Sequence, residues 1–285
     1  MNKRMILYIQ GAILLIESAI MVLPIAAALI YRETSGVWFF YTALAAAICG
    51  FAAMKLSKPR TKTIYAKEGL ITVALGWIVL SLVGALPFTL SGEIPFYLDA
   101  VFEMISGFTT TGSSILPNVE ALSRCMLLWR SFSHWLGGMG ILVFMLAIVK
   151  MEGGQGIHLL RAESPGPTVG KMVPRMVDSS KILYTIYFAL TLVQVVFYLA
   201  GGMPLFDSLC NAFATAGTGG FSIKADSFAS YSMYAQTVTT VFMALFGVNF
   251  SIYFFLLQKK FDLAFKNTEL RLVRHHDDRL RHGKL

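Results

Sequence analysis

Long apolar segments alternate with polar stretches along the whole chain. Hydrophobic residues make up 56% of the sequence, charged residues make up 14%, and the mean hydropathy is +0.64. These values exclude an ordinary soluble domain and predict an all-α membrane protein. Six segments approach or exceed the roughly 20 residues that a membrane helix needs: 5–30, 37–54, 70–90, 126–149, 182–200 and 234–257.

Two further apolar segments are too short to cross a bilayer, and each leads into a loop of small residues. The first precedes the loop FTTTGSS at 108–114, and the second precedes the loop AGTGGFS at 216–222. Apolar segments of about 10 to 14 residues are often re-entrant, and irregular backbone at membrane depth must be buried in protein or line a watery cavity. This pattern is typical of an ion-selectivity loop. The alternative is a pair of small-residue turns that allow close helix packing.

A shift of 108 residues places the first loop on the second. The stretch DAVFEMISGFTTTGSS at 99–114 lies over DSLCNAFATAGTGGFS at 207–222 without a gap. Each copy follows one predicted span and precedes another, and each such unit resembles one subunit of a tetrameric potassium channel. The expected regions are two N-terminal helices with a basic connector (1–66), the first pore unit (67–150), a cytoplasmic connector (151–181), the second pore unit (182–258) and a basic cytoplasmic tail (259–285).

The two loops contain the residue types that a potassium filter requires. Glycine adopts the unusual dihedral angles that turn successive carbonyls inward, and Gly112 and Gly220 suit this role. Each short helix ends at its loop, where its partial negative charge favours a cation. The predicted filter residues are Thr109, Thr110, Thr111, Gly112, Ser113, Gly217, Thr218, Gly219, Gly220 and Phe221. The predicted potassium ligands are the backbone carbonyls of Thr110, Thr111, Thr218 and Gly219.

Basic residues gather in alternate gaps between the predicted spans. With the N-terminus in the cytoplasm, 20 of the 24 lysines and arginines fall on the cytoplasmic side. Because basic residues accumulate in cytoplasmic segments, we predict that both termini are cytoplasmic and that both short helices enter from outside. The net charge of +8 does not indicate nucleic-acid binding, since the basic residues do not lie on one face.

Other residue types exclude some classes of function. The sequence has no phosphate-binding glycine loop and no nucleophile spaced with a base, so neither an enzyme nor an organic cofactor is expected. The three cysteines, Cys49, Cys125 and Cys210, show no metal-ligand or disulfide spacing and are expected to be buried free thiols.

Four polar residues near or inside apolar segments are weighed separately. Glu17 lies in the first predicted span, where a charge is costly, and is interpreted as a packing residue or a hydrogen-bonded neutral acid. Glu103 is expected to hydrogen bond the scaffold. His134, beside Arg130 near the start of a span, is expected to pack at the membrane interface rather than bind a metal.

Four motifs carry a resemblance to the TrkH/KtrB family of bacterial potassium-uptake proteins. They are SGFTTTGSS at 106–114, HWLGGMGILVF at 134–144, AESPGPTVGKMVPRM at 162–176 and NAFATAGTGGFS at 211–222. The two extra N-terminal spans resemble the TrkH type. The resemblance implies that Gly112 and Gly220 are the first two filter glycines and that potassium is transported. It also implies a bacterial inner-membrane location and a cytosolic nucleotide-binding regulatory subunit of TrkA type, docked on the 150–181 connector and the tail.

The family has four repeats and this sequence contains two. We therefore expect the N-terminal half of a TrkH-type transporter that takes up potassium, either as a homodimer or with a separate second half. One alternative is a non-conducting membrane subunit or truncated fragment that associates with a transporter. Another is a proton- or sodium-coupled carrier with Glu17 as its coupling site.

Overall fold

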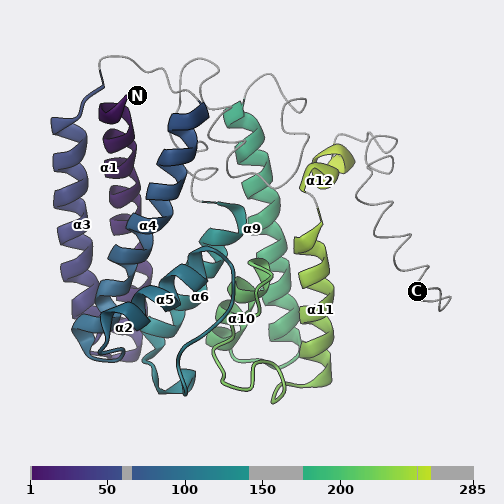
Figure 1. Cartoon of the computed structure of the whole chain (residues 1–285). Coiled ribbons are helices and arrows are strands. Elements are labelled where there is room, and N and C mark those ends of the chain that lie inside the picture. The colour runs from purple at the N-terminus through teal and green to yellow at the C-terminus, as the bar shows by residue number, and fades with distance from the viewer. Residues whose placement is uncertain (1, 60–65, 141–175, 249, 258–285) are drawn as a thin grey trace, which may run out of the picture.

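The computed structural model describes residues 2–59, 66–140, 176–248 and 250–257, and every regular element in these ranges is a helix (Figure 1). This agrees with the predicted all-α class. The helices are α1 (Lys3–Ile20), α2 (Val22–Tyr31), α3 (Gly36–Leu56), α4 (Ala66–Ser91), α5 (Tyr97–Phe108), the 3-10 turn η1 (Val119–Ala121), α6 (Arg124–Met139), α9 (Met176–Ala200), α10 (Leu205–Ala216), α11 (Met233–Gly247) and α12 (Phe250–Leu257).

Four helical segments in the described part are long and apolar enough to cross a membrane: Lys3–Tyr31, Gly36–Leu56, Glu68–Ser91 and Ile182–Ala200. They correspond to four of the six predicted spans, and they make this a multi-pass membrane protein. The predicted span 126–149 begins on α6, and its residues from 141 onward lie outside the described part. The predicted span 234–257 is not one helix, because α11 ends at Gly247 and Val248 is extended, with ψ of 139°.

The first predicted span is divided in the structure at Met21, between α1 and α2. Pro24 has no backbone N–H and cannot bond the carbonyl of Ile20, so the helical ladder is interrupted where α1 ends. Glycines allow close packing of α1 on α3, since a Cβ on Gly11 would lie 2.7 Å from the carbonyl oxygen of Gly50. Backbones that approach this closely are typical of small residues at membrane helix contacts.

The remaining helices form two successive units with short helices (Figure 1). In each unit a long helix, α4 or α9, is followed by a tight turn and then by a short helix, α5 or α10. Figure 1 shows both short helices in the half of the molecule far from the N-terminus. Helix α6 contacts both α5 and α10, whereas α11 contacts α9 and α10. Helix α6 therefore belongs to the first unit in sequence and touches the short helices of both units in space.

The N-terminus of α6 is held by carboxylates from distant turns. Glu33, beyond α2, accepts hydrogen bonds from the backbone N–H groups of Arg124 (2.8 Å) and Cys125 (2.9 Å). Glu93 accepts one from the backbone N–H of Ser123 at 2.7 Å. The first N–H groups of a helix have no partner within it, so these carboxylates fix where α6 begins and tie the two N-terminal spans to the first unit.

Three expectations about the connectors and thiols are tested or limited by the structure. Most of the predicted 151–181 connector and the 259–285 tail lie outside the described residues, and α9 already begins at Met176 inside the predicted connector. Cys125 and Cys210 are buried as predicted, but Cys49 is exposed. The prediction for Cys49 was wrong because its neighbour Gly50, about 100° further round α3, is the residue that faces α1.

Candidate ion-selectivity site

The loops after α5 and α10 share an unusual backbone conformation. The φ angles are 55° at Thr110 and 76° at Gly112 in the first loop, and 58° at Thr218 and 72° at Gly220 in the second. Glycine tolerates a positive φ, but for a β-branched residue such as threonine it is a genuine outlier. The two loops therefore share their positive φ angles at aligned positions.

The two loops lie directly against each other. A Cβ built on Gly112 would overlap the carbonyl group of Gly219, and one built on Gly219 would come within 2.5 Å of the carbonyl oxygen of Thr110. Gly220 has open space around its Cβ position. It borders a hollow of about 350 Å³ that is lined in part by Thr215, Thr239 and Gln236. The structure therefore brings the two predicted filter segments together and leaves one side of the second segment open.

Carbonyl groups of the loops divide into free and bonded ones. The carbonyl oxygen of Ser113 accepts a hydrogen bond from Oγ of Ser106 at 2.6 Å, and that of Gly220 accepts one from the N–H of Ser222 at 2.8 Å. The four carbonyls predicted as potassium ligands accept no hydrogen bond from any described residue: those of Thr110, Thr111, Thr218 and Gly219. A free carbonyl can still replace water around a cation.

Side chains of the other predicted filter residues stay close to their own helices. The hydroxyl of Thr109 donates to the carbonyl of Ile105 at 2.7 Å and lies 2.8 Å from the hydroxyl of Thr111. Gly217 follows the last residue of α10, and its Cβ position is filled by the ring of His134. These residues shape the loops rather than offering side-chain ligands.

Glycines of the HWLGGMG motif bring α6 against the ends of both short helices. A Cβ on Gly137 would overlap the carbonyl group of Phe108 at the end of α5. One on Gly138 would lie 3.1 Å from the carbonyl oxygen of Ala216 at the end of α10. These two glycines therefore allow close helix contact, and α6 forms a shared wall behind the two loops.

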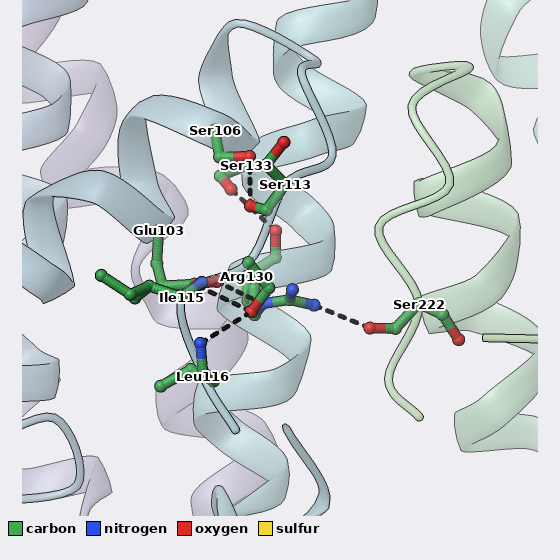
Figure 2. Close-up of polar contacts among 9 residues, drawn as sticks. Glu103, Ser106, Ser113, Ile115, Leu116, Arg130, Ser133 and Ser222 are labelled. Atoms are coloured by element: carbon green, nitrogen blue, oxygen red, sulfur yellow. Dashed lines mark hydrogen bonds and ion pairs between the residues drawn. The ribbon is translucent and has the colours of Figure 1, made fainter. Parts of the chain in front are cut away.

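A buried ion pair supports the first loop (Figure 2). Nε of Arg130 lies 2.8 Å from Oε2 of Glu103, and the two side chains are 2% and 0% exposed. Oε1 of Glu103 accepts hydrogen bonds from Oγ of Ser114 (2.7 Å) and the N–H of Ile115 (2.6 Å). Burying an ion pair is costly unless additional hydrogen bonds satisfy its atoms, and here they do. The predicted scaffold role of Glu103 is confirmed.

The second loop is held from the same helix by Arg130 and His134, one turn apart. Nη1 of Arg130 donates to the carbonyl of Ser222 at 2.7 Å (Figure 2). Nε2 of His134 accepts from the N–H of Gly219 at 3.1 Å. Between them lies the ring of Phe221, 3.3 Å from the Arg130 guanidinium carbon and 5.2 Å from the imidazole centre. Sequence reasoning missed both bonds, although the spacing of the two residues on one helix face was visible.

His134 was expected at a membrane interface, and this expectation was wrong. The side chain is fully buried, because α6 packs against both short helices. Glu17 is also fully buried, and neither of its carboxyl oxygens has a hydrogen-bond partner among the described residues. It packs on Gly84 of α4, which agrees with the interpretation of Glu17 as a packing residue.

Comparison with known proteins identifies the family. The chain matches the family TrkH, described as a cation transport protein, over residues 38–279. It is 37% identical over 259 residues to the Trk system potassium uptake protein TrkH of Halomonas elongata, covering 89% of this chain and 53% of that protein. It is 35% identical over 276 residues to TrkH of Salmonella typhimurium, covering 95% and 57%.

A solved structure gives the same result. The crystal structure of the potassium transporter TrkH from Vibrio parahaemolyticus superposes with a TM-score of 0.76 at 32% identity, covering 89% of this chain and 52% of that one. The chain spans about half the length of the curated relatives that it matches. Its match over most of its own residues shows that the chain belongs to the TrkH family of cation transport proteins, a family of transporters rather than enzymes.

Proposed function

We propose that this chain supplies two segments of a potassium-selectivity filter and serves potassium uptake down the electrochemical gradient. The observation that carries the proposal is the pair of loops with similar positive φ angles at aligned positions and free carbonyls at Thr110, Thr111, Thr218 and Gly219. A potassium ion gives up its water shell only where several carbonyl dipoles replace it. The relatives are named potassium uptake proteins, which supports potassium as the ion.

Helix dipoles add to the attraction for a cation. Helix α5 ends at Phe108 and α10 ends at Ala216, each immediately before its loop. The C-terminal end of a helix carries roughly half a negative charge, and both ends here lie beside the free carbonyls. No side-chain carboxylate is needed as a ligand, since the buried Glu103 already bonds Arg130 and the backbone behind the loop.

A closed filter needs more segments than the two described here. We propose that they come from a second copy of the chain or from a second half of the protein, beside the open side of Gly220. The proposal includes an inner-membrane location with both termini in the cytoplasm, and a TrkA-type nucleotide-binding subunit docked at the 150–181 connector and the tail. The docking idea fails if the purified chain does not bind such a subunit while a full-length relative does.

Rubidium uptake into proteoliposomes that hold the full chain tests the function. We expect potassium to compete with this uptake, and Gly112→Ser or Gly220→Ser to reduce the discrimination against sodium. Gly202→Ser is the matched control, because Gly202 has φ of 80° and open space around it, like Gly220, but lies in the turn between α9 and α10. No uptake by folded parent chain would favour the alternative, a non-conducting subunit or fragment that associates with a transporter.

The unpartnered carboxyl of Glu17 supports a second candidate, a proton- or sodium-coupled carrier. An intramembrane acid is a functional hypothesis by default. If Glu17 couples transport, Glu17→Gln should abolish gradient-driven uptake while the protein folds normally. Uptake that is unchanged in Glu17→Gln would leave passive permeation as the function.

A further inference from the structure

The peptide group between Thr218 and Gly219 contains both a predicted potassium ligand, the Thr218 carbonyl, and an N–H that is hydrogen bonded to His134. Its N–H belongs to Gly219 and donates to Nε2 of His134 at 3.1 Å. Its carbonyl belongs to Thr218 and accepts no hydrogen bond from the described residues. A trans peptide group is planar, with its N–H and C=O on opposite sides. The bond to His134 therefore turns the Thr218 carbonyl away from α6.

The first loop anchors the equivalent peptide group in a different way. The N–H of Thr111, which aligns with Gly219, donates to the carbonyl of Ser106 at 3.0 Å. That acceptor is backbone of α5, so the Thr110 carbonyl is oriented within one unit. In the second loop the acceptor is a side chain from α6, 85 residues away in sequence. A side chain can be replaced without altering the backbone, which makes this anchor testable.

The imidazole of His134 is enclosed by its neighbours. It is fully buried and stacks on the ring of Phe221, with 5.2 Å between the centres and 24° between the planes. Gly217 and Gly219 leave room for it, since a Cβ on either would overlap the ring. Nε2 needs a lone pair to accept the N–H of Gly219, so a neutral imidazole carries its proton on Nδ1. An enclosed ring with one available acceptor is well suited to fix a peptide plane.

We propose that His134 is a positioning residue: through the N–H of Gly219 it fixes the direction of the Thr218 carbonyl and thereby the preference of the second loop for potassium over sodium. This inference rests on the proposed function, because it assigns His134 a role in that same filter. A filter distinguishes cations by the number and placement of its carbonyl dipoles. A Thr218–Gly219 peptide without its anchor rotates and no longer presents that carbonyl at a fixed place.

Sodium competition against rubidium uptake by the full reconstituted chain tests the inference. His134→Leu replaces the acceptor with an apolar side chain, whereas His134→Gln supplies an amide oxygen that can accept. We expect the preference for rubidium over sodium to fall about fivefold in His134→Leu, the factor that one hydrogen bond corresponds to, and to recover partly in His134→Gln. Trp129→Phe is the control, because it deletes a buried hydrogen bond of the same helix, to the carbonyl of Gly84 at 3.0 Å.

Hydrogen exchange at the Gly219 amide gives a second measurement that does not depend on transport. We expect faster exchange at this amide in His134→Leu than in the parent and in Trp129→Phe. Unchanged cation preference in folded His134→Leu, or unchanged exchange at Gly219, would overturn the positioning role. Absence of rubidium flux in the parent would instead overturn the proposed function, and the exchange measurement would still decide whether His134 anchors the peptide.

Discussion

The two loops have positive φ angles at aligned positions but are supported by different side chains. Behind the first loop, Glu103 and Arg130 form a buried ion pair. At the position of the second unit that aligns with Glu103 stands Asn211, and α11 contains no charged residue. Oδ1 of Asn211 accepts a weak hydrogen bond of 3.5 Å from Ser222. The charged pair of the first unit has no charged counterpart in the second, so the second loop gains its firm contacts from elsewhere.

Those contacts come from the first unit. Arg130 bonds the carbonyl of Ser222, and His134 bonds the N–H of Gly219. The first loop receives no comparable side chain from α10 or α11 in the described part of the chain. The comparison teaches that a repeat in backbone geometry does not require a repeat in side chains. It also shows that the support runs in one direction, from the first unit to the second.

The largest expected effect comes from removing one partner of the buried ion pair in the first unit. Arg130→Val leaves the carboxylate of Glu103 buried without its partner, and breaking a buried pair in this way costs about 3–5 kcal/mol in the free energy of unfolding. The double variant Glu103→Asn with Arg130→Val should be more stable than the single one, since it removes the unpaired charge. Unfolding by sodium dodecyl sulfate in mixed micelles measures both, and a double variant no more stable than Arg130→Val would contradict the comparison.

The two filter glycines should differ in their tolerance of a side chain. Gly220→Ala introduces only the strain of a left-handed residue, about 1 kcal/mol, because nothing lies within 4 Å of its Cβ position. Gly112→Ala has a similar φ and also places its Cβ on the Gly219 carbonyl, so overpacking raises the loss to about 3 kcal/mol. Equal losses in the same unfolding titration would show that the loops do not touch as described.

A smaller effect is expected at the hydroxyl network behind α10. The hydroxyl of Tyr198 lies 2.7 Å from Oγ1 of Thr239 and accepts from Nε2 of Gln194 at 2.8 Å. Tyr198→Phe removes one hydrogen bond from each of these buried partners and should lower the free energy of unfolding by about 1–2 kcal/mol. Tyr97→Phe is the control in the first unit, because its hydroxyl bonds the Leu82 carbonyl at an exposed site and should change stability by only a few tenths. A larger loss of stability in Tyr97→Phe than in Tyr198→Phe would show that the hydroxyl of Tyr198 does not stabilise the second unit in this way.

Local features of the fold were accessible from the sequence. The short helices followed from the length of apolar segments, and glycine at 112 and 220 pointed to positive φ, which the structure has. Positive φ at Thr110 and Thr218 was not predictable, because threonine disfavours it and only the surrounding structure imposes it. The interruption of the helix at Met21, between α1 and α2, had a visible signal in Pro24. The end of α11 at Gly247 had no such signal in the sequence.

Contacts between distant segments were not accessible from one sequence. Glu103 and Arg130 were each noticed, but nothing in their local sequence indicates that they pair across 27 positions. The bond from Gly219 to His134 depends on how α6 tilts across both short helices, and that tilt is set by Gly137 and Gly138 together with distant carboxylates such as Glu33. Periodicity and composition describe a helix by itself and not the direction in which it packs.

The position of α6 beneath both loops has a consequence for the order of membrane insertion. A chain is synthesised from its N-terminus, and early segments fold before later ones are made. Helix α6 ends at Met139 and α10 begins at Leu205, so Arg130 and His134 are synthesised before the second loop. The side chains of the first unit that bond the second loop are thus available when that loop folds.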